Sequence, residues 1–484
     1  MRSQVSWTTA EERRLIIDQA MELLETVGMR FGACESLKRL AEAGARIDHS
    51  SGVARLPREL VERSLAGCPR EVLLAGATAE QDVVLDGSAV HFLPSGMPTK
   101  ILDAETGQVR MSTVGDLRRA AIVADAMPVV DIMWPPVGAA DVPEDEMSFA
   151  EVLTVLDWSD KHLQATVKVP WHVKPMLELM AEICGGLDAY RARPRVSFVI
   201  CTHSPLGIDG PFLDMTVKMA RHGAPLLVYP MPIAGATAPV TVAGAVTMDV
   251  AEFLAVATAI QLAAPGAPLV MGAGTSILDM KAGTFSFGAL ETALMCAACV
   301  EVGHEMGVPV LAPGLATDSL HGGVQAGYEK ALKGLAVAQS GADLITGGIG
   351  QLHGAGVFSL PQVVIDAEIA QMITRLLAGA EISPASIMND VTARVGFAGD
   401  FLRQKETSRR LRAGDVFMPE IASRLSWEAW NRRGRDELDV ARERADELVA
   451  TAEARGPLLP EGLRERLREI ASTALAAQRL ATGG

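Results

Sequence analysis

The chain has 484 residues, of which 49% are hydrophobic and 4% aromatic, so it has material for a large core built mainly from small aliphatic side chains. Its formal net charge of −15 excludes a general nucleic-acid-binding role, because contacts to phosphate need clustered lysine and arginine. Six cysteines in a chain of this length do not form a disulfide framework.

The chain carries no evident secretion signal or membrane span. Residues 1–30 contain acidic and basic side chains throughout, without the apolar run of a signal sequence. The longest apolar segments, near 250–264 and 289–303, are interrupted by glutamate or glutamine and fall short of the roughly 18–20 apolar residues of a membrane helix. We therefore expect a soluble cytoplasmic protein.

The first 87 residues predict an N-terminal helical region. Thr8 and Thr9, followed by Glu11, form a capping pattern for a first helix that ends at Gly28. A second helix is expected over 33–43 and a third over 57–66, where a proline opens the helix.

Residues 88–384 alternate between strand-length apolar runs and helix-length segments, with one strand and one helix in every 30–45 residues. This alternation predicts a parallel eight-stranded α/β barrel, the TIM (β/α)8 fold. The competing fold is an open doubly wound sheet, but no GxGxxG motif opens a helix at a strand end. The expected strands are 89–94, 129–134, 162–168, 196–202, 225–231, 268–273, 308–312 and 342–346, and the expected helices lie near 113–126, 146–159, 172–185, 211–222, 244–263, 287–306, 324–340 and 361–378.

Residues 385–484 predict a C-terminal helical extension. The segments 435–454 and 459–480 are charged, alanine-rich and amphipathic. We expect these two helices to pack on the barrel or on a neighbouring subunit.

The active site of a barrel enzyme lies in the loops that follow the strands. These loops are rich in glycine and proline and nearly uncharged, which favours a neutral or cationic small molecule over a phosphate ester, although the glycine-rich loop 272–276 could also hold an anion. The residues expected to bind the substrate are Tyr229, His203, Gln351, Thr275, Ser276, Trp134 and Met231, and those expected to act in catalysis are His353, Asp318 and Glu329.

Several of these residues also have a purely structural interpretation. His203 could cap its loop, Asp318 could form an Asx turn, Tyr229 could be a core ring and Glu329 could orient a helix. Trp134 and Trp171 could line a cage for a cation or only seal the mouth of the barrel.

Metal and imine chemistry were weighed as alternatives. Cys201 and His203 are two possible zinc ligands and Cys296 and Cys299 form a C-x-x-C pair, but the pair lies within a helix and no third ligand follows Cys201. We therefore expect that this chain binds no metal. Lys168 ends a strand and is the best candidate for a Schiff-base lysine.

Three segments carry a resemblance to a known family: 96–107, 317–330 and 364–369. Their order and spacing resemble those of the trimethylamine methyltransferase family, and the likeness extends over roughly residues 10–430. The resemblance implies a barrel that moves a methyl group from a methylated amine to the cobalt of a corrinoid (cobalamin) held by a separate protein. It also implies a homo-oligomer without bound zinc.

The founding archaeal members of this family carry pyrrolysine, whereas this sequence contains only standard residues. It therefore resembles the non-pyrrolysine branch, which implies a quaternary amine such as glycine betaine as the methyl donor. The donors expected for the betaine carboxylate are His353, Gln351, His203 and the pair Thr275–Ser276. The competing functions are a lysine-imine lyase or aldolase on the same barrel and a catalytically inactive barrel that binds a small molecule.

Overall fold

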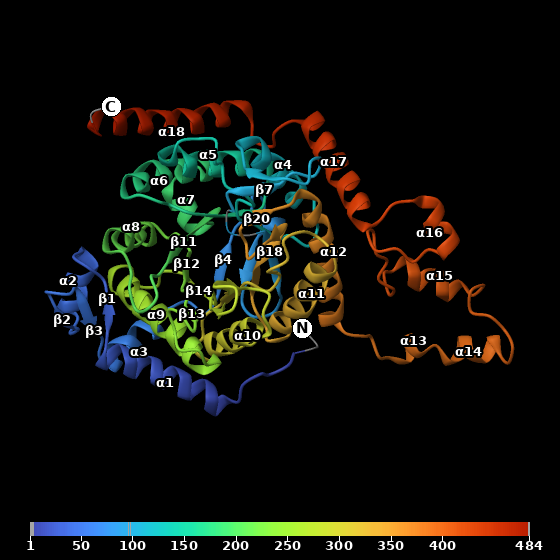
Figure 1. Cartoon of the computed structure of the whole chain (residues 1–484), viewed down its shortest axis with the longest axis horizontal. Helices are drawn as coiled ribbons and strands as arrows, with labels where there is room; N and C mark the ends of the chain where they lie inside the picture. Colours follow the sequence, from blue (N-terminus) through green and yellow to red (C-terminus); the bar gives the residue numbers. More distant parts are fainter. Residues whose placement is uncertain (1–3, 95, 97, 483–484) are drawn as a thin grey trace.

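The computed structural model describes residues 4–94, 96 and 98–482, and its centre is a closed parallel barrel of eight strands (Figure 1). The strand order around the barrel is β6-β18-β17-β14-β12-β11-β10-β9. A parallel bridge between Phe92 and Val130 brings β6 beside the start of β9 and closes the ring. The predicted TIM-barrel fold is thus confirmed, and the open doubly wound sheet is excluded.

All eight strands begin within a few residues of the expected positions, and a helix follows each of them. The barrel strands are β6 (His91–Pro94), β9 (Ile132–Met133), β10 (His162–Ala165), β11 (Val196–Cys201), β12 (Leu226–Tyr229), β14 (Leu269–Gly272), β17 (Val310–Ala312) and β18 (Leu344–Ile349). The helices that surround them are α4 (Val114–Asp125), α5 (Glu144–Trp158), α6 (Val173–Cys184) with the short α7 (Leu187–Ala192), α8 (Gly210–Arg221), α9 (Val242–Ala263), α10 (Leu290–Glu305), α11 (Val324–Gln339) and α12 (Leu360–Ala378).

The strands are buried on both faces, which explains why they read as continuous apolar runs. Their outward side chains pack against the helices in one large core, while a second, smaller core fills the barrel interior. Leu93, Val199, Leu227, Val270 and Leu344 belong to this inner core. The interior is therefore packed with side chains, as expected for eight strands.

The N-terminal region combines the three expected helices with five short strands that the sequence analysis did not anticipate. The helices are α1 (Ala10–Thr26), α2 (Glu35–Glu42) and α3 (Arg58–Ala66), and the strands are β1 (Met29–Arg30), β2 (Arg46–Asp48), β3 (Val53–Arg55), β4 (Val72–Leu74) and β5 (Val83–Leu85). The capping pattern is confirmed, since Thr9 and Glu12 form a reciprocal capping box at the start of α1. The helices pack on α9.

The hairpin β4–β5 closes the bottom of the barrel, at the amino ends of the strands. Its apolar side chains join the inner core. His162 links this plug to the barrel, because its Nδ1 lies 3.1 Å from the Ala75 carbonyl oxygen and its Nε2 lies 2.9 Å from the Ser197 hydroxyl. Burial lowers the pKa of His162 to about 3, so its imidazole is neutral.

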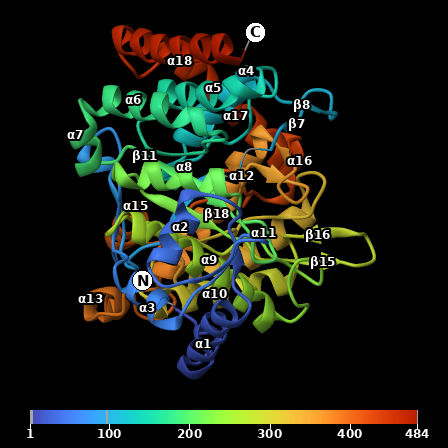
Figure 2. The same cartoon turned by 90° about the vertical axis from the view of Figure 1, so that its left-hand side faces the viewer.

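Two small sheets stand over the opposite end, where the strands terminate. One contains β19 (Gln351–Leu352), β20 (Val357–Phe358), β7 (Lys100–Leu102) and β8 (Val109–Met111), and the other contains β13 (Ile233–Ala234), β15 (Ser276–Asp279) and β16 (Thr284–Ser286). Figure 2 shows the hairpins β7–β8 and β15–β16 projecting on the same side of the molecule. The loops after the strands therefore form a structured rim.

The C-terminal region begins with four short helices on a segment that extends away from the barrel (Figure 1): α13 (Pro384–Ile387), α14 (Asn389–Val395), α15 (Lys405–Arg412) and α16 (Trp427–Arg433). The two predicted amphipathic helices follow as α17 (Glu437–Arg455) and α18 (Glu461–Thr482). Helix α17 packs on α12 and α4, and α18 packs on α6 and α5. Of the two expected packing partners, the barrel of the same chain is the one observed.

Helix α9 is long and apolar enough to cross a membrane, and it is the one helix with that property among the described residues. It is largely buried within the protein, where α1, α3, α8 and α10 pack around it. Asp249 and Glu252 lie on its buried surface. These features are those of a core helix in the barrel wall.

Candidate functional site

Two aromatic side chains meet at the centre of the barrel mouth. Trp134, directly after β9, and Tyr229, at the end of β12, pack edge to face with ring centroids 6.5 Å apart. The Tyr229 ring lies against Gly272, where an added Cβ would come within 2.0 Å of Cδ2 of the ring. Burial raises the pKa of the Tyr229 phenol well above its ordinary value, so the hydroxyl stays protonated. These rings form an apolar floor with polar N–H and O–H groups.

A pocket of about 500 Å³ lies among the loops and hairpins of the rim, and we call it the rim pocket. It lies between the hairpin β15–β16, the loop after β17 and the loop after β18. Two of the predicted catalytic residues, Asp318 and His353, line it together, with the basic side chain of Lys100 and the ring of Phe285. The remaining lining residues are Asp279, Ala282, Thr284, Ser286, Leu320, Gly354 and Gly356.

The loop that carries His353 has an unusual backbone. His353, Gly354 and Ala355 all have positive φ values, between 53° and 67°, which costs energy at the two residues that have a Cβ. A Cβ on Gly354 would lie 3.5 Å from the Phe285 ring and 3.8 Å from Oδ1 of Asp318. The turn therefore brings His353 to the pocket while the glycine leaves the space between ring and carboxylate open.

Asp318 and Glu329 form a chain of hydrogen bonds that fixes one wall of the rim pocket. Asp318 accepts hydrogen bonds from the backbone N–H of Phe287 (2.9 Å) and Gly288 (3.0 Å) and from the Ser286 hydroxyl. Glu329, on α11, accepts from the backbone N–H of Asp318 (2.9 Å) and from the Thr317 hydroxyl (2.5 Å). Both predicted catalytic carboxylates are thus engaged in holding the loop and the hairpin in place.

A fully buried ion pair lies behind the loop that leads to His353. Nζ of Lys330 lies 2.7 Å from Asp366 on α12 and donates to the Gly348 carbonyl at 2.5 Å. Asp366 also accepts from the Gly350 N–H (2.8 Å) and the Gln362 amide (2.8 Å). The charges are therefore matched and hydrogen-bonded, and they set the course of the loop that leads to His353.

A third buried network lies on α9. Thr275 donates to Asp249 at 2.6 Å, and Glu252 accepts from the hydroxyls of Thr202 and Ser204 and from the Leu206 N–H. Burial raises the pKa of both carboxyls, that of Asp249 well above its ordinary value. Thr275 is therefore engaged with Asp249 behind the loop.

The other predicted substrate-binding residues are spread around the rim. Met231 is exposed and lies against Gly274, and Ser276 is buried at the start of β15. Gln351 is buried in β19 and faces the loop at Gly96. His203 is exposed on the separate loop after β11, where its backbone N–H donates to the Gly207 carbonyl. In the loop after β6, Ser95 and Met97 lie outside the described residues.

The residues considered for metal binding and imine chemistry have the following surroundings. Among the described residues, no group of three or more His, Cys, Asp or Glu side chains is suited to a metal ion. Cys296 and Cys299 are buried in α10. Lys168 donates to the sulfur of Met147 at 2.8 Å, away from the residues of the rim pocket.

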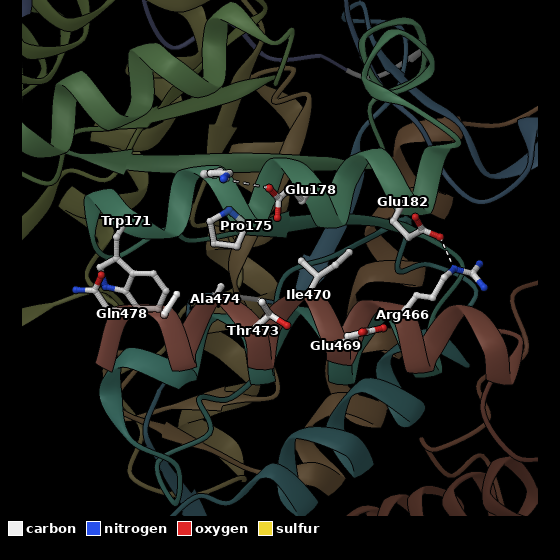
Figure 3. A pocket seen from close by; sticks show the side chains of 12 residues that line it. Trp171, Pro175, Glu178, Glu182, Arg466, Glu469, Ile470, Thr473, Ala474 and Gln478 are labelled. Atoms are coloured by element: carbon white, nitrogen blue, oxygen red, sulfur yellow. Dashed lines mark hydrogen bonds and ion pairs between the residues drawn. The ribbon is translucent and has the colours of Figure 1, made fainter. Parts of the chain in front are cut away.

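A larger cavity of about 610 Å³ lies outside the barrel wall. It is a groove between α6 and α18, in which Trp171, Pro175 and Glu178 face Ile470 and Ala474 (Figure 3). Trp171 packs there against Phe149 and His172. The expectation that Trp171 lines the barrel mouth is therefore wrong, because its loop turns outward as α6 begins.

Sequence reasoning missed the pocket residues Lys100 and Phe285 and the buried residues Asp249, Lys330 and Asp366. Lys100 and Phe285 lie on strands of the rim sheets, which have no counterpart in the strand–helix alternation. The buried charges did leave a signal, because an Asp or Lys on the apolar face of a helix needs a buried partner.

In chemical terms, the rim pocket combines one lysine and two aspartate side chains, Lys100, Asp279 and Asp318, with the aromatic ring of Phe285. Such a set matches a small molecule that carries both charges and an apolar part. The floor offers N–H and O–H groups on otherwise apolar rings.

Comparisons with known proteins agree over the whole chain. The family model "Trimethylamine methyltransferase (MTTB)" matches residues 2–476. A trimethylamine methyltransferase of Desulfitobacterium hafniense is 30% identical over 95% of this chain and 92% of its own length. A glycine betaine methyltransferase of another strain of that species is 26% identical over 91% of this chain and 92% of its own length.

The fold has a solved counterpart. The crystal structure of the Methanosarcina barkeri monomethylamine methyltransferase aligns with a TM-score of 0.54 at 13% identity, covering 92% of this chain and 89% of that one. At this identity the likeness concerns the fold alone. The match of the family model over nearly the full length carries the assignment: this chain belongs to the trimethylamine methyltransferase family.

Proposed function

We propose that this protein transfers a methyl group from a carboxylated quaternary amine, of the glycine betaine type, to the Co(I) of a corrinoid held by a separate protein in the cytoplasm. The observation that carries the proposal is the rim pocket, in which Lys100 and His353 lie together with Asp318 and Phe285 at the C-terminal end of the barrel. A betaine is a zwitterion. Its carboxylate suits Lys100 and His353, and its methylated ammonium suits Asp318 and Phe285.

The reaction needs little from the protein beyond placement. The carbon–nitrogen bond breaks and nitrogen keeps the electron pair, so a neutral tertiary amine leaves. The electron pair of Co(I) forms the new bond to carbon, and no proton moves. The main contribution of the pocket is thus to align nitrogen, methyl and cobalt, which removes much of the entropic cost.

The roles of the residues follow from the change in charge. The positive charge on nitrogen disappears during transfer, so tight binding of the cation would stabilise the substrate more than the transition state. The Phe285 ring and the carboxylates of Asp318 and Asp279, which already accept hydrogen bonds from backbone N–H groups, provide only moderate attraction for the cation. Lys100 and His353 bind the carboxylate, whose charge is constant, so the binding energy they supply does not oppose the reaction.

A quaternary substrate is favoured over trimethylamine for two reasons. The sequence contains only standard residues, and a quaternary ammonium needs no activation because its leaving group is already neutral. The relatives of this chain include both a glycine betaine methyltransferase and trimethylamine methyltransferases, so the choice rests on these two reasons. Asp318 and Glu329 then act as positioning residues that hold the pocket wall.

The test is a spectroscopic assay of the purified protein with cob(I)alamin. Glycine betaine, proline betaine, carnitine and choline are each added, and conversion to methylcob(III)alamin is followed by its absorption. We expect conversion with at least one carboxylated amine. If none of the four supports methylation, the proposal is wrong.

The His353→Ala variant tests the carboxylate site. Loss of the imidazole removes one carboxylate partner, so we expect KM for the carboxylated substrate to rise about tenfold, the effect of roughly 1.4 kcal/mol, while KM for choline changes little. His49→Ala, on the surface of the N-terminal region, is the matched control. An equal loss for both substrates would refute this role for His353.

A further inference from the structure

Helix α11 carries two buried lysines that differ in their partners. Nζ of Lys330 lies 2.7 Å from the carboxylate of Asp366. Lys333, which is 2% exposed, has its Nζ 2.7 Å from the Phe287 carbonyl oxygen, and no carboxylate of the described residues lies within ion-pair distance of it. A buried cation without a carboxylate destabilises the fold, and a methionine of similar length would avoid this cost. The stability of the fold therefore does not explain Lys333.

Lys333 is connected to the rim pocket through a single residue, Phe287. Its Nζ donates to the Phe287 carbonyl and lies 5.5 Å from the centroid of the Phe287 ring. The backbone N–H of Phe287 donates to Asp318 at 2.9 Å, and its ring packs edge to face on Phe285, with centroids 5.2 Å apart. Asp318 and Phe285 both line the rim pocket. The buried ammonium therefore lies behind the wall of the pocket.

The charge of Lys333 opposes a group of carboxylates at the pocket. Asp279 and Asp318 line the pocket, and Glu329 accepts from the N–H of Asp318 behind it. Among the described lining residues Lys100 is the one lysine, so without Lys333 a single lysine would oppose three carboxylates. Burial lowers the pKa of Lys333, whereas the charges of Asp318 and Glu329 act to raise it. The carboxylates thus favour the charged form of this lysine.

We propose that Lys333 acts on the reaction through its buried charge, which weakens the attraction of the pocket carboxylates for the methylated ammonium and thereby favours the loss of positive charge from nitrogen. This inference rests on the proposed function. The nitrogen is positive before transfer and neutral after it, because it keeps the electron pair of its broken bond to carbon. A positive charge behind the wall therefore raises the energy of the bound ammonium more than that of the transition state. Lys333 is a positioning residue in this role, since it contacts Phe287 and not the substrate.

Burial makes this charge effective across the wall. The interaction between two charges is stronger within a protein than in water, where the solvent and its salt screen it. Lys281, in the turn between β15 and β16, also lies near the pocket, because its neighbour Ala282 is one of the lining residues. Lys281 is exposed, so water screens its charge. It is therefore the matched control for Lys333, with the same charge and the opposite burial.

The test compares the binding of a cation with that of a neutral molecule of the same shape, without cobalamin. The dissociation constants of choline and of its isostere, in which carbon replaces the ammonium nitrogen, are measured by calorimetry. In Lys333→Met we expect the ratio of the choline constant to the isostere constant to fall about fivefold, because a positive charge is lost behind the pocket. A merely structural role would weaken both ligands and leave the ratio unchanged. In the methyl-transfer assay, kcat of Lys333→Met should fall about fivefold as well.

Three further variants separate the charge of Lys333 from its packing. Lys333→Met/Glu329→Gln removes one charge of each sign, so the ratio should return toward that of the wild type. A structural defect caused by the loss of Lys333 would not be repaired by a second substitution in the same wall. Glu329→Gln alone should raise the ratio, and it tests the inference if Lys333→Met does not fold. Lys281→Met should leave the ratio unchanged.

The inference and the proposed function fail separately. A ratio that stays constant or rises in a folded Lys333→Met overturns the inference, even if the wild type transfers methyl groups. A shifted ratio with unchanged kcat also overturns it, and so does a wild type that binds neither choline nor its isostere. A shifted ratio without methyl transfer from any amine supports the charge of Lys333 at the pocket and refutes the proposed reaction.

Discussion

The side chains that matter most for the candidate site are buried charges on the helices behind it. Lys330 and Asp366 are both fully buried and hold the loop that leads to His353 through Gly348 and Gly350. Lys330→Met leaves the Asp366 carboxylate buried without its cation, which costs about 3–5 kcal/mol, so the melting temperature should fall by several degrees. Lys330→Met/Asp366→Leu should recover much of this loss. If Lys330→Met alone has the melting temperature of the wild type, the ion pair between Lys330 and Asp366 does not stabilise the fold.

Asp249 makes stability depend on pH in a defined direction. Burial raises the pKa of its carboxyl above the ordinary 3.8, so between that pH and the raised value the unfolded chain loses a proton that the folded chain keeps. The free energy of unfolding therefore falls as pH rises through this window. Asp249→Asn keeps an acceptor for Thr275 and removes the titration. The melting temperature of Asp249→Asn minus that of the wild type should increase from pH 5 to pH 8. A difference that stays constant over this range would argue against a raised pKa of Asp249.

Among the elements, the hairpin β15–β16 depends on one carboxylate from another loop. Asp318→Ala removes the acceptor for the N–H groups of Phe287 and Gly288, so hydrogen exchange at 284–288 should accelerate at least tenfold. Asp103→Ala is the matched control, because Asp103 accepts from Glu105 and Thr106 in the β7–β8 turn. It should accelerate exchange in that turn only. Unchanged exchange at 284–288 would show that the hairpin holds its position without Asp318.

The elements that the sequence predicted are those with a strong local pattern. Each barrel strand is an apolar run buried on both faces, and each helix has an apolar stripe or an apolar sequence throughout. The short strands β4 and β5 have only three residues each, too few for a period to be recognised. Their position as the plug of the barrel follows from tertiary packing, which no local pattern encodes.

At the scale of the whole molecule, the sequence predicted which loops lie at the mouth of the barrel better than it predicted the residues that line the rim pocket. Asp318 and His353 come from the loops of adjacent strands and do meet in the rim pocket. Lys100 and Phe285 reach the same pocket from rim sheets that form only once the loops pair. His203 lies on the loop of a more distant strand, since β12, β14 and β17 separate β11 from β18.

The central claim is that the barrel mouth transfers a methyl group from a carboxylated quaternary amine. The most direct measurement uses glycine betaine labelled with ¹³C in its methyl groups and cob(I)alamin, followed by nuclear magnetic resonance in one sample. We predict that each labelled methyl found on cobalt is matched by one molecule of dimethylglycine, and that trimethylamine gives no transfer under the same conditions. Transfer from trimethylamine with none from any carboxylated quaternary amine would contradict the account.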